Sequence, residues 1–146
     1  MSKKFAEHSK LNLSQTGKEM LKQWGEEDLF HRSFTEKEGC PSFIFFEGPP
    51  SANGHPGIHH VMGRTIKDTF LRYKTMQGFQ VKRKAGWDTH GLPVELSVEK
   101  SLGITKEDIG KKISVDDYND ACRKNVMMYT DEWSDLTNKM GYWVDL

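Results

Sequence analysis

The most constraining feature of the sequence is an abrupt change of pattern between Ser42 and Gly78. A continuously apolar run, "SFIFFEG" over residues 42–48, leads into "EGPPSANGHPGIHH" over residues 47–60, a segment rich in glycine, proline and histidine. Apolar residues then recur at spacings of three and four: Ile58, Met62, Ile66, Phe70 and Tyr73. An unbroken apolar run is typical of a strand buried on both faces, and the later spacing is typical of a helix. We therefore expect strand, loop and helix in that order.

A second strand is expected directly after this helix. Gly78 is placed as the residue that ends the helix, and "FQVKRKAGW" over residues 79–87 follows it. Strand, helix and strand within such a short segment predict a βαβ unit with two parallel strands. Ligands of such sheets lie outside the carboxyl ends of the strands. Residues 48–60 and 86–95 are therefore expected to be neighbours at one crevice.

The remaining elements are predicted from capping and helix-breaking residues. They are a polar lead-in over 1–13, a helix over 16–28 opened by Thr16 and Glu19, a connection over 32–41, a short turn over 101–112 and one long helix from Ser114 to Gly141. Together with the βαβ unit, these elements predict an α/β fold with flanking helices.

Composition excludes several classes of protein. Lysine plus arginine and aspartate plus glutamate each number 21, so the chain as a whole does not attract nucleic acid by charge. Its apolar runs are far shorter than the roughly 20 residues needed to cross a bilayer, and its start lacks the apolar stretch of a secretory signal. Cys40 and Cys122 are far apart, which disfavours a zinc cage and indicates a reducing compartment. We expect a cytoplasmic protein without membrane contact.

The loop between strand and helix has the chemistry of an anion site, although it matches neither common phosphate motif. Neither G-x-x-x-x-G-K-[ST] nor G-x-G-x-x-G occurs here. A helix N-terminus still offers free N–H groups, Gly54 and Gly57 allow close backbone approach, and His59 and His60 add donors. A charge-assisted hydrogen bond contributes about 1.5–3 kcal/mol, compared with about 0.3–1 kcal/mol for the helix dipole. The imidazoles would therefore dominate contacts to phosphate.

These motifs resemble those of class I aminoacyl-tRNA synthetases. "GPP", "ANG" and a glycine–histidine signature that opens a helix are similar to the start of that family's catalytic domain, and the resemblance spans residues 14–146. "GWDTHGLPVE" over residues 86–95 is similar to the members that activate isoleucine. A valyl member would show a "GTDHAGI"-like stretch there, and a leucyl member "GWDAFGLPAE".

The resemblance implies a fold and an activity. It implies a Rossmann-like nucleotide-binding domain split by insertions, ATP-dependent activation of isoleucine with Mg²⁺ accompanying the ATP, and transfer to tRNA(Ile). The lysine-rich second signature and the editing and anticodon-reading regions of the family are not found in these residues. We therefore expect an N-terminal part of a monomeric enzyme, inactive alone, with a lead-in and helix over 1–40 and half of the catalytic domain over 41–146.

For the amino acid, the resemblance implies a pocket next to the first strand. Gly48 and Pro49 would form its wall, and Asp88 would pair with the α-ammonium group of the substrate. His90 and Glu95 are further candidates, either for substrate contact or for hydrogen bonds within their own turn.

For ATP, the resemblance implies contacts from the loop and from the start of the helix. Asn53, Gly54, Gly57, His59 and His60 are the candidates, and His59 and His60 are the catalytic ones. His60 matches the last histidine of the His-x-Gly-His signature of the family.

The sequence departs from this signature at two positions, because Gly57 stands where histidine is expected and His59 where glycine is expected. Either His59, or else His55, reaches the phosphates from another backbone position, or the site is weakened. A zinc pair of His55 and His59 is not supported, because Pro56 and Gly57 lie between them. The alternatives to an isoleucine-activating enzyme are a valyl or leucyl synthetase and a non-catalytic fragment or interaction module.

Overall fold

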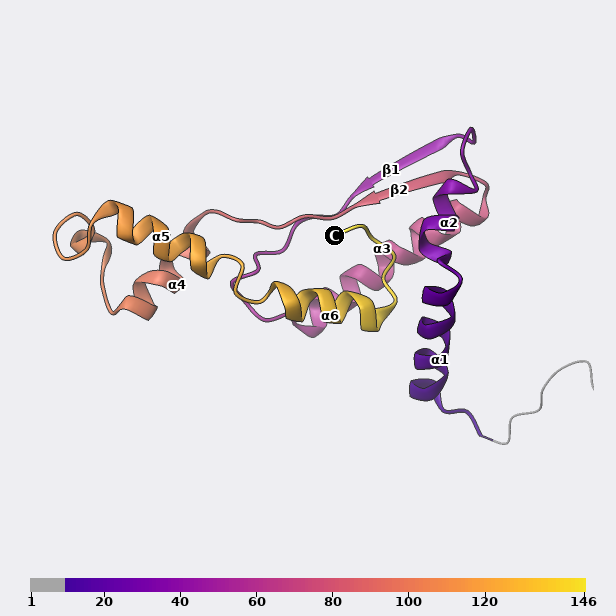
Figure 1. Ribbon diagram of the computed structural model, residues 1–146, viewed down its shortest axis with the longest axis horizontal. Helices are drawn as coiled ribbons and strands as arrows, with labels where there is room; N and C mark the ends of the chain where they lie inside the picture. Colours follow the sequence, from indigo (N-terminus) through magenta and orange to yellow (C-terminus); the bar gives the residue numbers. More distant parts are fainter. Residues whose placement is uncertain (1–9) are drawn as a thin grey trace, which may run out of the picture.

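The computed structural model describes residues 10–146, so the first nine residues of the expected lead-in lie outside the described part. The elements in chain order are α1 (Leu13–Glu26), α2 (Leu29–Thr35), β1 (Ser42–Phe46), α3 (Ile58–Met76), β2 (Gln80–Lys84), α4 (Leu92–Leu102), a 3-10 turn η1 (Lys106–Asp108), α5 (Val115–Asn125) and α6 (Thr130–Met140). Figure 1 shows an elongated molecule, with the α4–α5 pair at the end opposite α1 and α2.

The predicted βαβ unit is confirmed. Strands β1 and β2 pair in parallel, from Ser42 opposite Gln80 to Phe46 opposite Lys84, and α3 connects them. The two backbone segments stay paired just beyond the strands, because the Glu47 N–H donates to the Lys84 carbonyl at 2.8 Å. The carboxyl ends of both strands therefore lead into neighbouring loops, as Figure 1 shows.

The prediction that β1 is buried on both faces is wrong. Burial alternates along β1, and the Ile44 and Phe46 side chains are 62% and 73% exposed. Phe43 and Phe45, on the other face, are half-buried and lie opposite Val81 and Arg83 of β2. An apolar run shows that both faces of a strand carry apolar side chains, but it does not show whether another element packs on each face. Within residues 10–146 no element buries the outer face.

The predicted helix after the loop is confirmed as α3, but its apolar stripe faces solvent. The stripe residues are all more than half exposed: Ile58, Met62, Ile66, Phe70 and Tyr73. The face turned to the protein instead buries Arg64 and Leu71. The helix ends as expected, with Gly78 in the left-handed region at a φ of 93°.

The start of the chain differs from the prediction in two places. Helix α1 begins at Leu13, and Asn12 caps it by accepting a hydrogen bond from the Gln15 N–H at 3.1 Å, so the predicted capping box of Thr16 and Glu19 is wrong. The expected connection over 32–41 contains the end of a second helix, α2, which packs on α1 and β2. An asparagine one turn earlier is as good a cap as the threonine, so local sequence does not choose between them.

The long helix predicted from Ser114 to Gly141 is broken into α5 and α6. Its ends are as predicted: Ser114 caps α5 through the Asp117 N–H, and Gly141 ends α6. The break occurs where the Tyr129 N–H donates to the Ala52 carbonyl at 2.9 Å, outside its own helix. A long-range contact has replaced a helical hydrogen bond there, which a periodic pattern does not reveal.

Helix α4 was not predicted. Proline is well tolerated in the first helical turn, where Pro93 lies, and α4 runs from Leu92 to a left-handed Gly103. It packs on α5. The buried apolar residues of this pair are Val94, Val98, Tyr118 and Val126. A second group is buried around the sheet: Leu71, Val81, Trp133, Tyr142 and Val144.

The segment after α6 runs beside β2. The Ala85 N–H donates to the Asp145 carbonyl at 2.7 Å, and the Asp145 N–H donates to the Arg83 carbonyl at 3.2 Å. The Arg72 guanidinium lies 3.9 Å from the ring centre of Trp143 and 4.8 Å from that of Trp24. These contacts join α1 and α3 to the last residues of the chain.

Two glycines share one backbone conformation but differ in their surroundings. Replacing each by alanine therefore separates the cost of crowding from the cost of backbone strain. Gly103 and Gly141 both end helices at a φ of 64°, but only Gly141 is crowded, because a Cβ there would lie 3.0 Å from Cζ3 of Trp24. Gly103→Ala should lower the free energy of unfolding by about 1–2 kcal/mol. Gly141→Ala should cost roughly 1–3 kcal/mol more. Equal losses in urea unfolding would contradict this packing of Trp24.

Candidate functional site

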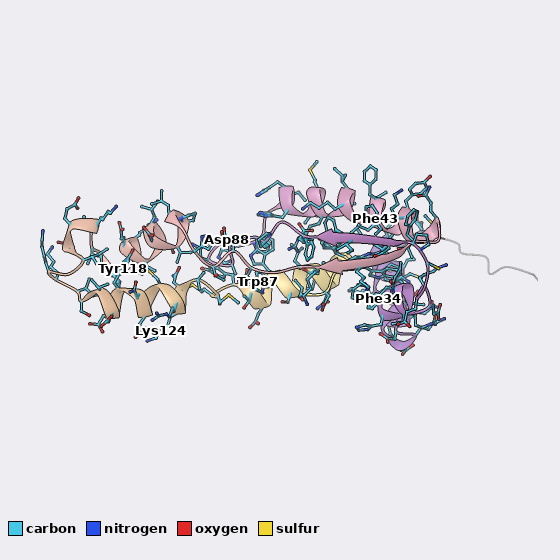
Figure 2. The ribbon with its side chains drawn as sticks, turned by 90° about the horizontal axis from the view of Figure 1, so that it is seen from above. Phe34, Phe43, Trp87, Asp88, Tyr118 and Lys124 are labelled. Atoms are coloured by element: carbon cyan, nitrogen blue, oxygen red, sulfur yellow. The ribbon has the colours of Figure 1, made fainter. Side chains whose placement is uncertain are left out.

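The two loops predicted to face one crevice do lie side by side. Ser51 and Asp88 form a parallel bridge, and the Asp88 N–H donates to the Pro50 carbonyl at 3.0 Å. Farther along, the Asn53 side-chain amide donates to the Pro93 carbonyl at 3.0 Å. Figure 2 shows Trp87 and Asp88 midway along the molecule, between the sheet and the α4–α5 pair. The candidate residues of both loops therefore share one region.

The Asp88 carboxylate is held by its neighbours and remains open on one side. Ser51 Oγ donates to Oδ2 at 3.2 Å, and the His90 N–H reaches Oδ1 at 3.4 Å. About a third of the side chain is exposed. Because an ionised carboxylate has about four acceptor sites, Asp88 keeps the capacity to bind an ammonium group.

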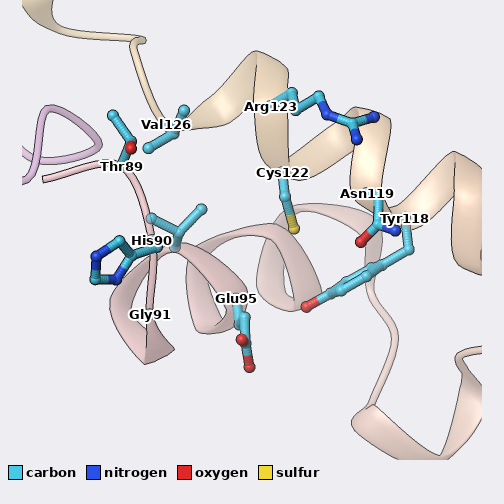
Figure 3. Close-up of a pocket in the computed structure, with 10 residues that line it drawn as sticks. Thr89, His90, Gly91, Glu95, Tyr118, Asn119, Cys122, Arg123 and Val126 are labelled. Atoms are coloured by element: carbon cyan, nitrogen blue, oxygen red, sulfur yellow. The ribbon is translucent and has the colours of Figure 1, made fainter.

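His90 and Glu95 lie at the border of a different hollow. Figure 3 shows this cleft between α4 and α5, with a volume of about 500 Å³. Its lining residues include His90, Glu95, Tyr118 and Cys122, and Asp88 is not among them. The structure therefore brings Asp88 close to the first loop and places Glu95 in the other cleft, while His90 borders both, because its Nδ1 lies 3.8 Å from Asp88 Oδ1.

Gly48 and Pro49 follow directly on β1 and are exposed. A Cβ at Gly48 would meet no heavy atom within 4 Å. The residue before them, Glu47, is buried, with only 3% of its side chain exposed. The loop thus begins with the buried carboxylate of Glu47 and continues with the exposed residues Gly48 and Pro49.

The start of α6 holds the middle of the loop, a contact that the sequence did not reveal. The Trp133 indole N–H donates to the Gly54 carbonyl at 2.9 Å, and the Tyr129 N–H donates to the Ala52 carbonyl. His55 Nδ1 lies 2.7 Å from a carboxylate oxygen of Glu132, and its ring stacks at 4.0 Å on Tyr129. In the sequence, Trp133 was one member of an apolar stripe. Its polar N–H was the only signal of another role.

His60 is fixed at the start of α3 by its neighbours. Its Nδ1 accepts a hydrogen bond from the Gly57 N–H at 2.9 Å, and its ring meets Trp133 edge to face at 4.6 Å. A ring whose Nδ1 accepts carries its proton on Nε2 in the neutral form. The donor that His60 offers in this form is therefore its Nε2–H.

Gly57 and His59 are sterically coupled. A Cβ on Gly57 would lie 2.8 Å from Cε1 and 2.9 Å from Nδ1 of the His59 ring. The His59 ring also lies 3.8 Å from the His60 ring, centre to centre. The glycine that replaces the expected histidine thus provides the space that the His59 ring occupies. The exchange of the two residues is consistent as a pair.

The electrostatics of this corner favour the neutral form of His60. Burial lowers the pKa of His60 from its ordinary value of 6.5, and the nearby charges of His59 and Arg64 lower the pKa further. Arg64 is itself buried, with its guanidinium 4.9 Å from the ring centre of Trp133.

Among residues 10–146 there is no group of three or more acidic, histidine or cysteine side chains able to hold a metal ion. No helix of that described part is long and apolar enough to span a membrane.

The fold and the loop geometry place the chain among proteins with a class I nucleotide-binding fold. Its structure is similar to LeuRS in a ternary complex, "Agrobacterium radiobacter K84 agnB2 LeuRS-tRNA-LeuAMS", with a TM-score of 0.63 and 21% sequence identity. The similarity covers 88% of this chain and 14% of that chain. This likeness confirms the α/β class I fold predicted from the sequence.

The sequence comparison identifies the family. Residues 19–146 match the family described as "tRNA synthetases class I (I, L, M and V)", and the chain belongs to it. Isoleucine–tRNA ligase of Bacteroides thetaiotaomicron is 74% identical over the whole chain, and that of Porphyromonas gingivalis is 68% identical. Isoleucine–tRNA ligase 2 of Bacillus cereus is 50% identical over 91% of the chain. The chain spans about 13% of the length of these curated relatives.

His60 gives a pH dependence whose sign follows from its lowered pKa. Because the folded state disfavours protonated His60, the free energy of unfolding should fall as the pH drops through 6.5. In His60→Asn, the amide oxygen can accept the Gly57 N–H without titrating. Urea unfolding between about pH 5 and pH 8 should show a smaller slope for this variant. The same slope in both proteins would contradict a lowered pKa for His60.

Proposed function

We propose that this chain is the part of an isoleucine–tRNA ligase in which ATP and isoleucine meet. The observation that carries the proposal is the contact of the Asp88 loop with the loop that leads to His60, through the Ser51–Asp88 bridge. This contact brings the Asp88 carboxylate, which can bind an ammonium group, close to the start of α3, which can bind phosphate. The identities of 67–74% with enzymes named isoleucine–tRNA ligase support isoleucine as the amino acid.

The reaction needs positioning and charge stabilisation rather than a protein nucleophile. The carboxylate of isoleucine attacks the α-phosphate of ATP in line, and pyrophosphate leaves. The start of α3 supplies backbone N–H groups, and His60 supplies its Nε2–H, to the phosphates. His59, which is exposed beside His60, adds a second imidazole. Mg²⁺ enters with ATP as part of the substrate.

Isoleucine lies at the other end of the loop in this proposal. Its α-ammonium group pairs with Asp88, and its side chain lies against Gly48 and Pro49. Asn53 and Gly54 border the nucleotide together with Gly57. The polar contacts of Asn53 with Pro93, and of Gly54 with Trp133, hold this border in place. His90 and Glu95, whose cleft lies between α4 and α5, act on the site only through the turn that contains Asp88.

The activity belongs to the longer protein in this proposal, since the chain spans about 13% of its relatives. The segment that holds α1 and α2 precedes the catalytic domain, and residues 41–146 form half of that domain. The complete enzyme is a cytoplasmic monomer that passes isoleucine to tRNA(Ile). Isoleucine-dependent exchange of pyrophosphate into ATP by the full-length protein tests the proposal. Exchange that depends on valine or leucine, or on no amino acid, would contradict it.

Asp88 should control the affinity for the amino acid. Asp88→Asn keeps the size of the side chain and can still accept from Ser51, but it removes the negative charge. Loss of about 1.5–3 kcal/mol of charge-assisted hydrogen bonding should raise KM for isoleucine roughly ten- to hundredfold. KM for ATP should change much less, which serves as the internal control. A parallel rise in both constants would argue against pairing of Asp88 with the ammonium group.

The Gly57–His59 pair gives a second test in the same assay. His59→Gly should lower pyrophosphate exchange by about ten- to thousandfold, the scale of losing one donor to the transition state. Gly57→His should also be impaired, because its side chain meets the His59 ring. The double variant has no such collision and should be more active than Gly57→His alone. Unchanged exchange in His59→Gly would remove the proposed catalytic role of that residue.

A further inference from the structure

Glu47 is a buried carboxylate that the proposed reaction does not use. It lies between the last residue of β1 and Gly48, and only 3% of its side chain is exposed. Burying a carboxylate is costly unless both of its oxygens are satisfied. A residue of this kind directly before the proposed amino-acid pocket requires an explanation.

Both oxygens of Glu47 have partners, and each partner comes from a different part of the chain. Lys67 Nζ of α3 donates to Oε1, and the Tyr142 hydroxyl, just after α6, donates to Oε2. The backbone N–H of Glu47 donates to the Lys84 carbonyl at the end of β2. One side chain thus joins β1 to α3 and to the segment after α6, while its backbone joins it to β2.

Burial and the neighbouring charges shift the pKa values of two groups around Glu47, Tyr142 and Arg64. Burial, followed by the hydrogen bond and the charge of Glu47, raises the pKa of Tyr142, so the hydroxyl remains a donor. Burial lowers the pKa of Arg64, and the negative charge of Glu47 opposes that shift. Arg64 donates to Thr137 Oγ1 at 2.8 Å and lies over the Trp133 ring.

The cluster also reaches the phosphate end of the site. His60, Arg64 and Lys67 recur at spacings of four and three on α3, so they lie along one side of the helix. Trp133 contacts both Arg64 and His60. The position of the α3 start relative to the end of β1 is therefore set by Glu47 and Lys67, with Arg64 and Trp133 beside them.

We infer that Glu47 is a positioning residue, which fixes Gly48 and Pro49 at the amino-acid end of the site relative to His60 at the phosphate end. This role rests on the proposed function, because it is defined by the attack of one substrate on the other. Each substrate binds mainly to one end of the site, so loosening the link leaves binding nearly intact. In-line attack requires both ends at once, and a misplacement of about 1 Å can cost on the order of a hundredfold in rate.

The test uses Glu47→Gln in the full-length protein. The amide keeps the shape of the side chain, but it replaces one acceptor oxygen by a donor facing Lys67 or Tyr142. We expect kcat for isoleucine-dependent pyrophosphate exchange, per titrated active site, to fall about ten- to hundredfold. KM for isoleucine and KM for ATP should each stay within about twofold.

Two milder variants and one matched control accompany it. Tyr142→Phe removes a single hydroxyl, and Lys67→Met removes the ammonium group while keeping an apolar side chain of similar length. Each should lower kcat in the same direction and by less than Glu47→Gln. Asp145→Asn breaks a lysine–carboxylate pair that links β2 to the same segment, Lys84 to Asp145 at 2.6 Å, but that pair is exposed. The control should leave kcat and both KM values unchanged.

The outcomes separate the positioning role from the function on which it rests. If the wild-type protein lacks isoleucine-dependent exchange, the proposed function is wrong and the role of Glu47 is wrong with it. If the wild type is active and Glu47→Gln keeps its kcat, only the positioning role is overturned. The same holds if Glu47→Gln merely lowers the number of titratable sites and the melting temperature, because that is the signature of a purely structural residue.

Discussion

The candidate site depends most on the contact of Trp133 with the loop between β1 and α3. The loop is long and rich in glycine and proline, and within it only Glu47 and Ala52 are buried, so burial alone does little to fix its shape. Trp133 is 2% exposed and supplies what the loop lacks: its N–H holds the Gly54 carbonyl, and its ring meets His60. A side chain 79 residues from Gly54 in sequence therefore helps to determine where the imidazole of His60 lies.

A second consequence of this contact is the break between α5 and α6. For α6 to present Trp133 to the loop, the chain must turn before it, and the Tyr129 N–H bonds to Ala52 at that turn. His55 then rests on the Tyr129 ring beside Glu132. The interrupted helix and the ordered loop are thus two aspects of one packing arrangement.

The sequence predicted those parts of the fold that depend on local pattern. The apolar run and the helical spacing were sufficient for β1, α3 and β2, and the rule for parallel strands placed Asp88 beside the first loop. The pattern failed where a distant contact decides the outcome. The apolar stripe of α3 resembles a core-facing stripe, yet the helix turns Arg64 inward to meet Trp133 and Thr137. Arg83, in a run of basic residues, is buried for a similar reason, with Thr75 and the Trp143 carbonyl as partners.

The same division applies to the site. Residue types and the order of elements predicted that His60 and Asp88 lie at one crevice, whereas the amino-acid pocket of Gly48 and Pro49 was implied by the resemblance to class I synthetases and stays a prediction. They could not show that His60 uses Nδ1 to cap its own helix, or that α4 begins at Leu92 and carries Glu95 toward α5. Those facts depend on side-chain orientation and on the packing of α4, a helix that was not predicted.

The contact between Gly57 and His59 also limits how this segment can change over evolutionary time. The His59 ring occupies the space into which a Cβ at position 57 would extend, so a larger residue at 57 requires this exposed ring to move. A change from the reverse arrangement passes either through a form in which two rings compete for this space or through one that has lost both rings, so the effect of each replacement depends on the other residue. Pattern searches that score the two positions separately would miss this dependence of one residue on the other.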